Sequence, residues 1–381
     1  MAEWGRNYVV LAMLKRLHLQ NFTVFADADF EFSPGLNVLV GANGTGKSHV
    51  LKVGYAVEEA RLATNKRYVS DQPISPTAIS IAWAKMQAES LERVFLVSHL
   101  APFLRWSTEE GAEIEVAFEA EKNVSFELTS TTIEAYANSS ARAFAMPGSK
   151  SELSRPVFIP AKDILTLSWI MPGSEQIVIP IESNYIDLFK QLSLLPLRNP
   201  DSVEAIAALT DIIGGEIRAE GDTYFLVDKN GRRVAINMIA EGLRKFGALQ
   251  KLLANGSLTK NTTLYWDEPE ANLNPALLRK LAAILAELAR QGFQIILATH
   301  STDLLKEFHI LSRQKDAKPL PIKYFGLNAE PGEATRIVTT DNFEYLPDVV
   351  ALSEELKQAD ELEEIFIRED QEYHANNRGK E

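Results

Sequence analysis

The chain has 381 residues, 46% of them hydrophobic, and a formal net charge of −13. It has no cysteine, which excludes disulfides, thiolate catalysis and zinc sites built on cysteine. No apolar run is long enough to span a bilayer, so we expect a cytoplasmic protein with no membrane contact. The negative charge also argues against a uniformly basic surface for nucleic acid.

The first strong motif is a phosphate-binding loop. An apolar run at 36–40 predicts a buried strand before it, and a helical pattern follows from Lys47 to Ala60. The loop itself fits GxxxxGK[ST] and reads Gly41, Ala42, Asn43, Gly44, Thr45, Gly46, Lys47, Ser48. Its glycines let backbone N–H groups surround phosphates, while Lys47 reaches the β- and γ-phosphates and the Ser48 hydroxyl binds Mg²⁺. The sequence therefore predicts a site for a nucleoside triphosphate.

The middle of the chain is harder to interpret. Polar and apolar residues alternate over 113–119 and 124–128, which predicts an antiparallel hairpin with one wet face. The run 157–160 predicts a further strand of the main sheet, followed by a loop at 161–163 that faces the nucleotide. Apolar spacing within 184–209 predicts helices broken at two prolines, Pro196 and Pro200.

A second hairpin is predicted over 223–236, with Asn230-Gly231 as its turn. No heptad pattern continues for the several repeats that a long coiled coil requires.

Two adjacent carboxylates follow the apolar run 262–266. A Mg-nucleotide hydrolase needs such a pair, so we assign Asp267 to the metal and Glu268 to activation of water. The next apolar run, 293–298, leads to His300. Taken alone, this histidine is more often a structural hydrogen-bonding group. Beside the carboxylate pair, the favoured interpretation is that it hydrogen-bonds the γ-phosphate and the attacking water.

The C-terminal segment 346–381 is acidic and is interpreted as a helix with a tail. Apolar residues at Leu352, Leu356, Leu362, Ile365 and Phe366 suggest an amphipathic helix. The favoured interpretation is a solvated helix packed by one face, with a frayed end. The alternative is an element that docks a partner.

The order of these motifs resembles the ABC-type ATPase heads of the RecF, SMC and OLD group. The opening strand at 13–22 and the approach to the loop at 30–41 share in the resemblance, which covers roughly 13–65 and 220–305. It implies an α/β P-loop NTPase fold with an antiparallel β-lobe and an inserted helical lobe. We expect the head to occupy 13–345, after an extension at 1–12. Within the head, 66–180 would hold the β-lobe or insert, and 181–260 the helical lobe and signature segment.

Two positions depart from that group. Thr23 stands where a basic residue commonly lies near the nucleotide. The signature loop resembles Ile239–Lys245, but Ala240 replaces the serine that would meet a partner's γ-phosphate. The helix N-terminus over Ala240, Glu241 and Gly242 could still bind this anion, or the segment is an ordinary amphipathic helix. The glutamine of the family's glutamine loop has two unsupported candidates, Gln87 and Gln176.

The resemblance implies a head-to-tail homodimer that encloses two ATP molecules with Mg²⁺ and hydrolyses ATP to ADP and phosphate. We expect a sensor or clamp in DNA maintenance and repair or in antiviral defence, with double-stranded DNA or a separately encoded nuclease or toxin as partner. The alternative is a slow-turnover regulatory scaffold that binds a protein without touching DNA. A transporter ATPase is the least favoured interpretation.

Overall fold

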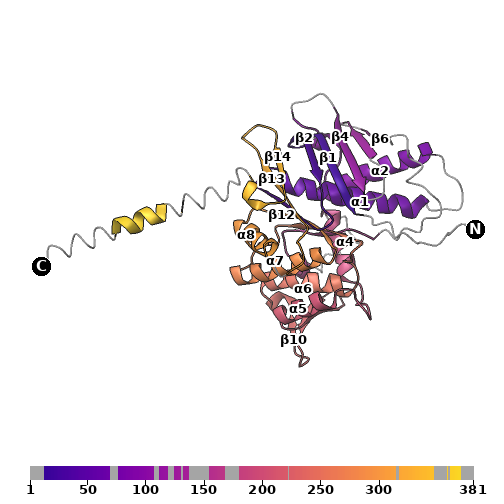
Figure 1. Cartoon of the computed structure of the whole chain (residues 1–381). Helices are drawn as coiled ribbons and strands as arrows, with labels where there is room; N and C mark the ends of the chain where they lie inside the picture. Colours follow the sequence, from indigo (N-terminus) through magenta and orange to yellow (C-terminus); the bar gives the residue numbers. More distant parts are fainter. Residues whose placement is uncertain are drawn as a thin grey trace, which may run out of the picture.

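The computed structural model describes residues 13–68, 76–106, 111–118, 124–129, 132–136, 154–167, 180–221, 223–314, 317–346, 358 and 361–369. The expected extension at 1–12 and much of the expected acidic tail lie outside these residues. Figure 1 shows two lobes on either side of a central sheet.

The central sheet has the strand order β14-β13-β3-β12-β11-β7. Its strands are β3 (Leu36–Gly41), β7 (Val157–Ile159), β11 (Thr263–Asp267), β12 (Gln294–Thr299), β13 (Ile322–Asn328) and β14 (Arg336–Thr340). All neighbours are parallel except β13 and β14. The carboxyl ends of β3, β12 and β11 therefore meet at one edge, where open α/β sheets place their ligands. This confirms the expected α/β class and the expected strand at 157–160.

Both faces of the sheet are buried, which explains its nearly continuous apolar strands. In β12, Ile295 and Leu297 belong to one core, whereas Ile296 and Ala298 belong to the other. The period of two along a strand sends alternate side chains to opposite faces. The sheet thus joins two hydrophobic cores and holds its loop-bearing edge rigid.

One core lies under an antiparallel β-lobe with the order β2-β1-β4-β5-β6. Its strands are β1 (Leu14–Phe22), β2 (Phe25–Glu31), β4 (Ala112–Phe118), β5 (Val124–Leu128) and β6 (Ile133–Tyr136). The predicted hairpin is confirmed as β4 and β5, with Glu115 opposite Ser125. Two helices pack together beside it, α1 (Lys47–Tyr68) and α2 (Pro76–Phe95). Sequence reasoning did not predict α2.

The other core supports the helical lobe. Its helices are α4 (Ser183–Leu192), α5 (Val203–Ile213), α6 (Glu241–Ala254), α7 (Pro275–Arg290) and α8 (Thr302–Ser312). The break between α4 and α5 contains both predicted prolines. A small sheet of order β10-β9-β8 lies before α6, with β8 (Glu216–Glu220), β9 (Thr223–Val227) and β10 (Arg233–Ala235). Its β9–β10 hairpin confirms the predicted turn, where Gly231 has a φ of 79°.

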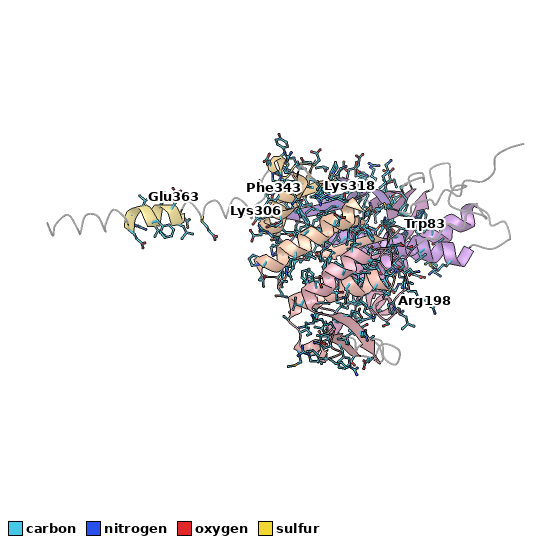
Figure 2. All side chains as sticks on the ribbon, turned by 60° about the horizontal axis from the view of Figure 1, so that its bottom comes forward. Trp83, Arg198, Lys306, Lys318, Phe343 and Glu363 are labelled. Atoms are coloured by element: carbon cyan, nitrogen blue, oxygen red, sulfur yellow. The ribbon has the colours of Figure 1, made fainter. Side chains whose placement is uncertain are left out.

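Short 3-10 turns complete the described elements: η1 (Ala101–Phe103), η2 (Leu165–Leu167), η3 (Ile236–Met238) and η4 (Phe343–Tyr345). Residues 361–369 are helical, and Leu362, Ile365 and Phe366 are all exposed there. Figure 2 labels Glu363 on this helix. The predicted packing by one apolar face is therefore not seen over 361–369, and Leu352 and Leu356 lie outside the described residues. No described helix is long and apolar enough to cross a membrane.

Candidate nucleotide site

The phosphate-binding loop connects β3 to α1 at the ligand edge of the sheet. Gly44 and Gly46 have φ values of 84° and 92°, which favour glycine because a Cβ is strained there. A Cβ on Gly46 would also lie 2.6 Å from side-chain atoms of both Val24 and Phe25. Gly46 is therefore required both by its backbone conformation and by the closeness of the turn between β1 and β2.

Lys47 is folded back over its own loop. Its Nζ donates to the carbonyl oxygens of Gly41 at 2.8 Å and Ala42 at 2.9 Å, and only 7% of the residue is exposed. Burial lowers the pKa of Lys47, while the charges of Asp267 and Glu268 act in the opposite direction. Because charged acceptors bind an ammonium group more strongly than neutral carbonyls, a phosphate fits this position.

Asp267 lies at the end of β11, close enough to the Ser48 side chain for the two to interact. Burial raises the pKa of Asp267, and the nearby charge of Glu268 raises it further. One hydroxyl and one carboxylate suit Mg²⁺, which usually keeps several waters and takes substrate phosphates as its other ligands. The described residues hold no cluster of three or more metal-binding side chains, so the donors present fit a phosphate-linked Mg²⁺ and not an all-protein cage.

Glu268 has a left-handed backbone, with a φ of 45°. Two contacts hold it: its N–H donates to the Ala298 oxygen at 2.9 Å, and its own carbonyl accepts from Lys245 Nζ at 2.9 Å. Left-handed conformations of non-glycine residues cost about 1–3 kcal/mol and persist where surrounding contacts impose them. The carboxylate is thus directed by a strained and doubly anchored backbone.

His300 follows β12, and its side chain is half exposed. Its Nδ1 lies 3.4 Å from Glu268 Oε1 and 3.7 Å from Glu270 Oε1. The fold therefore brings His300 and Glu268 together, as expected from their neighbouring strands.

Glu270 is a site residue that sequence reasoning missed. Its Oε1 accepts from the Thr299 hydroxyl at 2.6 Å and from the His300 N–H at 3.3 Å. Glu270 Oε2 is buried and has no hydrogen-bond partner among the described residues. Glu270 ties the loop after β11 to the end of β12. Its place in the Asp267–Glu270 run was the available signal.

Lys245 is a second missed residue. It lies on α6, only 4% of it is exposed, and burial lowers its pKa against the opposing charge of Glu270. Its neighbour Arg244 pairs with Asp163 and donates to the Ile239 oxygen. The loop at 161–163 thus contacts α6. The available signal in the sequence was the pair of adjacent charged residues, Arg244 and Lys245, beside the apolar face of this helix.

The signature segment has one exposed and one buried residue among those predicted to face a phosphate. Ala240 is exposed and is the N-cap of α6, which has no side-chain cap. Gly242 is buried, and a Cβ there would lie 2.7 Å from the Asn272 oxygen. The segment therefore packs on the loop after β11 and presents Ala240 outward.

Other candidates lie elsewhere. Gln87 is buried on α2 and donates to the Val57 oxygen at 3.3 Å, so it has a structural contact away from the loop. Gln176 lies outside the described residues. Thr23, which replaces the basic residue of the resemblance, has a φ of 48° and hydrogen-bonds His49 Nδ1 at 3.0 Å.

Two protein-family models match segments of this chain. A model described as "AAA domain, putative AbiEii toxin, Type IV TA system" matches residues 105–306. A second model, described as an AAA domain, matches residues 16–53 and so includes the phosphate-binding loop.

Two curated relatives are both named DNA replication and repair protein RecF. The Salmonella arizonae protein is 46% identical over 48 residues, which is 13% of each chain. The Listeria welshimeri protein is 30% identical over 112 residues, 29% of this chain and 28% of the relative. The matches thus span less than a third of either relative.

A solved SMC head bound to the C-winged helix domain of ScpA has a similar structure. It is 15% identical, with a TM-score of 0.51, and covers 86% of this chain and 98% of its own. At this identity the likeness shows the fold alone, and that fold is the P-loop head predicted from the motifs.

Proposed function

The chain belongs to the AAA-domain family whose model spans residues 105–306. We propose that it is an ABC-type head like those of the RecF and SMC group and that it binds and hydrolyses ATP. The observation that carries the proposal is the electrostatic contact of Asp267 with Ser48 and Lys47. It joins the phosphate-binding loop to a strand that ends in two carboxylates.

In this proposal the amides of the loop 41–48 and the Lys47 ammonium bind the β- and γ-phosphates. Ser48 and Asp267 would hold Mg²⁺, which when bound neutralises charge on the transferring phosphoryl group. Glu268 accepts a proton from the attacking water, and His300 hydrogen-bonds the γ-phosphate. The anchored backbone of Glu268 fits this role because a general base needs a fixed direction.

The proposed active form is a homodimer in which Ala240, Glu241 and Gly242 face the γ-phosphate held by the partner. The N-terminus of α6 supports this because its first amides have no side-chain cap, and such amides bind anions. Gly242 is itself buried against Asn272, so the exposed Ala240 gives the sharper test.

Two substitutions at Ala240 separate anion binding from helix stability. Both aspartate and serine are good N-caps, but only aspartate places a negative charge opposite a phosphate. In a Glu268→Gln background with ATP and Mg²⁺, we expect Ala240→Asp to abolish dimers in sedimentation velocity. Ala240→Ser should retain them. Equal dimer fractions in the two variants would place the dimer contact elsewhere.

We further propose that the ATP cycle drives a sensor or clamp in DNA repair or antiviral defence, with a separately encoded nuclease or toxin as effector. The relatives named as DNA repair proteins support the repair role, and the type IV TA system named in the family description supports the defence role. If duplex DNA docks on the closed dimer, mobility shifts should require ATP. They should also weaken with salt, with a log–log slope of about −0.9 per phosphate contacted.

The second candidate function is a slow-turnover scaffold that binds a protein partner without DNA contact. Ala240 favours it because the hydroxyl expected at a signature loop is missing, as does the net charge of −13. The mobility-shift series discriminates: no ATP-dependent shift even at low salt would support the scaffold.

A further inference from the structure

Trp106 is fully exposed, with a relative accessible area of 101%. Trp83 on α2 (Figure 2) and Trp266 are buried, at 3% and 0%. Tryptophan is highly buried on average, and a large exposed aromatic ring is a typical means of binding a planar ligand. The position of Trp106 in the fold decides which ligand it meets.

The segment before Trp106 is fixed to the turn between β1 and β2. The Arg105 N–H donates to the Asn21 oxygen at 2.9 Å, and the Thr23 N–H donates to the Phe103 oxygen at 2.8 Å. These two backbone hydrogen bonds fix Arg105, and Trp106 is the next residue in the chain. Its backbone is therefore held beside this turn.

The same turn lies against the phosphate-binding loop. Val24 and Phe25 are the residues whose side chains leave no room for a Cβ on Gly46. Thr335 connects the two segments, because its N–H donates to the Val24 oxygen at 3.0 Å and its hydroxyl to the Thr45 oxygen at 3.1 Å. Trp106 is thus connected to the loop through one turn.

The turn also touches the start of α1 through the Thr23–His49 hydrogen bond. A nucleotide bound by its phosphates at the N-terminus of α1 must direct its ribose and base outward, past the loop. On the side of this turn, Thr23 and Val24 have short side chains, and the Phe25 ring is fully buried, so the turn itself presents no exposed aromatic surface. Trp106 supplies one.

We propose that Trp106 stacks on the base of the bound nucleotide, an inference that rests on the proposed function. The site then takes a nucleoside polyphosphate in preference to bare polyphosphate. Every base has a π-face, so stacking strengthens binding without selecting a particular base.

Calorimetric titration of Mg²⁺-loaded protein with ADP and with inorganic tripolyphosphate tests this. Trp106→Ala should raise the Kd for ADP about tenfold, near the low end of what a lost base stack costs. The Kd for tripolyphosphate should stay within twofold, and Trp106→Phe should restore most of the ADP affinity. Leu195→Ala is the matched control, since Leu195 is an exposed large apolar residue of the helical lobe and should change neither Kd.

An unchanged Kd for ADP in Trp106→Ala overturns the proposal. An equal loss of affinity for ADP and for tripolyphosphate also overturns it. A second measurement uses wild-type fluorescence. ADP should quench tryptophan emission in the wild type and not in Trp106→Phe, whereas equal quenching in both would also overturn it. Failure of the proposed function looks different: the wild type would then bind neither ligand.

Discussion

The site has a phosphate-binding half, formed by the phosphate-binding loop and the end of β11, and a signature half, formed by the N-terminus of α6. The two differ in whether their polar groups already have partners within one chain. The first is closed: Lys47 is buried and bonded to two carbonyls of its own loop, and Ser48 already meets Asp267. The second is open at Ala240, where α6 begins without a side-chain cap. Two other helices of the same lobe are capped, α7 by Asn274 and α8 by Ser301.

Helices α4 and α5 of this lobe also begin without a side-chain cap, so α6 is distinguished by its resemblance to a signature and not by the missing cap alone. Uncapped amides cost stability that Ser, Thr, Asn or Asp would recover. At α6 the uncapped amides belong to the segment that resembles a signature, where an anion from another molecule can supply the cap. We therefore expect changes in the closed half to alter binding and chemistry in each subunit, and changes in the open half to alter assembly.

The largest expected effect concerns the closed half. Glu268→Gln removes the proposed base, so steady-state turnover should fall roughly 10²-fold or more while ATP binding stays unchanged. A phosphate-release assay beside a calorimetric titration measures both quantities. Turnover at the wild-type rate would show that another group activates the water.

Lys47→Ala should act on binding itself. Loss of a charge-assisted contact to phosphate should weaken ATP binding about 10²-fold, because a hydrogen bond to a charged group contributes about 1.5–3 kcal/mol. Lys52→Ala is the control on the same helix: Lys52 pairs with Glu182 at 2.6 Å and lies outside the loop motif. Unchanged calorimetric binding in Lys47→Ala would remove this lysine from the phosphate site.

A third test concerns a buried carboxyl that joins α1 to β11. Glu58 Oε1 accepts from the Thr263 hydroxyl at 2.8 Å and from the Tyr265 hydroxyl at 3.0 Å. Burial raises the pKa of Glu58 to about 7. Since the folded pKa exceeds the ordinary value of 4.5, the folded state binds this proton more tightly. Its contribution to stability is complete below about pH 4.5 and is lost as the pH rises to about 7.

Glu58→Gln stays neutral and keeps an oxygen acceptor. Relative to the wild type, its free energy of unfolding should therefore rise between pH 5 and pH 8, by on the order of 2 kcal/mol. Urea unfolding at the two pH values measures this difference. Glu59, whose pKa burial also raises to about 7, is present in both proteins, and its charge is one cause of the raised pKa of Glu58. A difference independent of pH would show that Glu58 is charged in the folded protein.

The smallest expected effect sharpens the contrast between capped and uncapped helices. Ala240→Ser should stabilise the nucleotide-free protein by about 1 kcal/mol, as an N-cap hydroxyl does, and Asn274→Ala should destabilise it by a similar amount. Thermal unfolding of both variants measures this. If Ala240→Ser does not raise the stability, the first amides of α6 already have hydrogen-bond partners, and the signature half is not open.

The sequence predicted most where chemistry requires fixed residue types at fixed spacing. The loop 41–48, the strand that ends at Asp267 and the position of His300 follow from local patterns. The first hairpin follows from its alternating polar and apolar residues, the second from its Asn230-Gly231 turn, and the break between α4 and α5 from Pro196 and Pro200. The meeting of β3, β11 and β12 at one edge follows from parallel pairing.

Long-range packing escaped prediction. Lys245 reaches the Glu268 carbonyl across 23 positions of sequence, and no local pattern encodes that approach. The backbone of Glu268 is left-handed because contacts from Ala298 and Lys245 hold it, although glutamate has no preference for this conformation. Helix α2 was missed since its segment offers no motif, and Gln87 was considered for chemistry although it serves packing.

The Lys245 contact has a thermodynamic consequence in the proposed dimer. Helix α6 would meet one nucleotide through its N-terminus, while Lys245 on the same helix holds the backbone of the glutamate that serves the other nucleotide. A shift of α6 on closure would then be felt at both sites. By linkage, any such coupling is reciprocal for binding free energies. The two ATP molecules would bind cooperatively, and the first to be hydrolysed would change the affinity for the second.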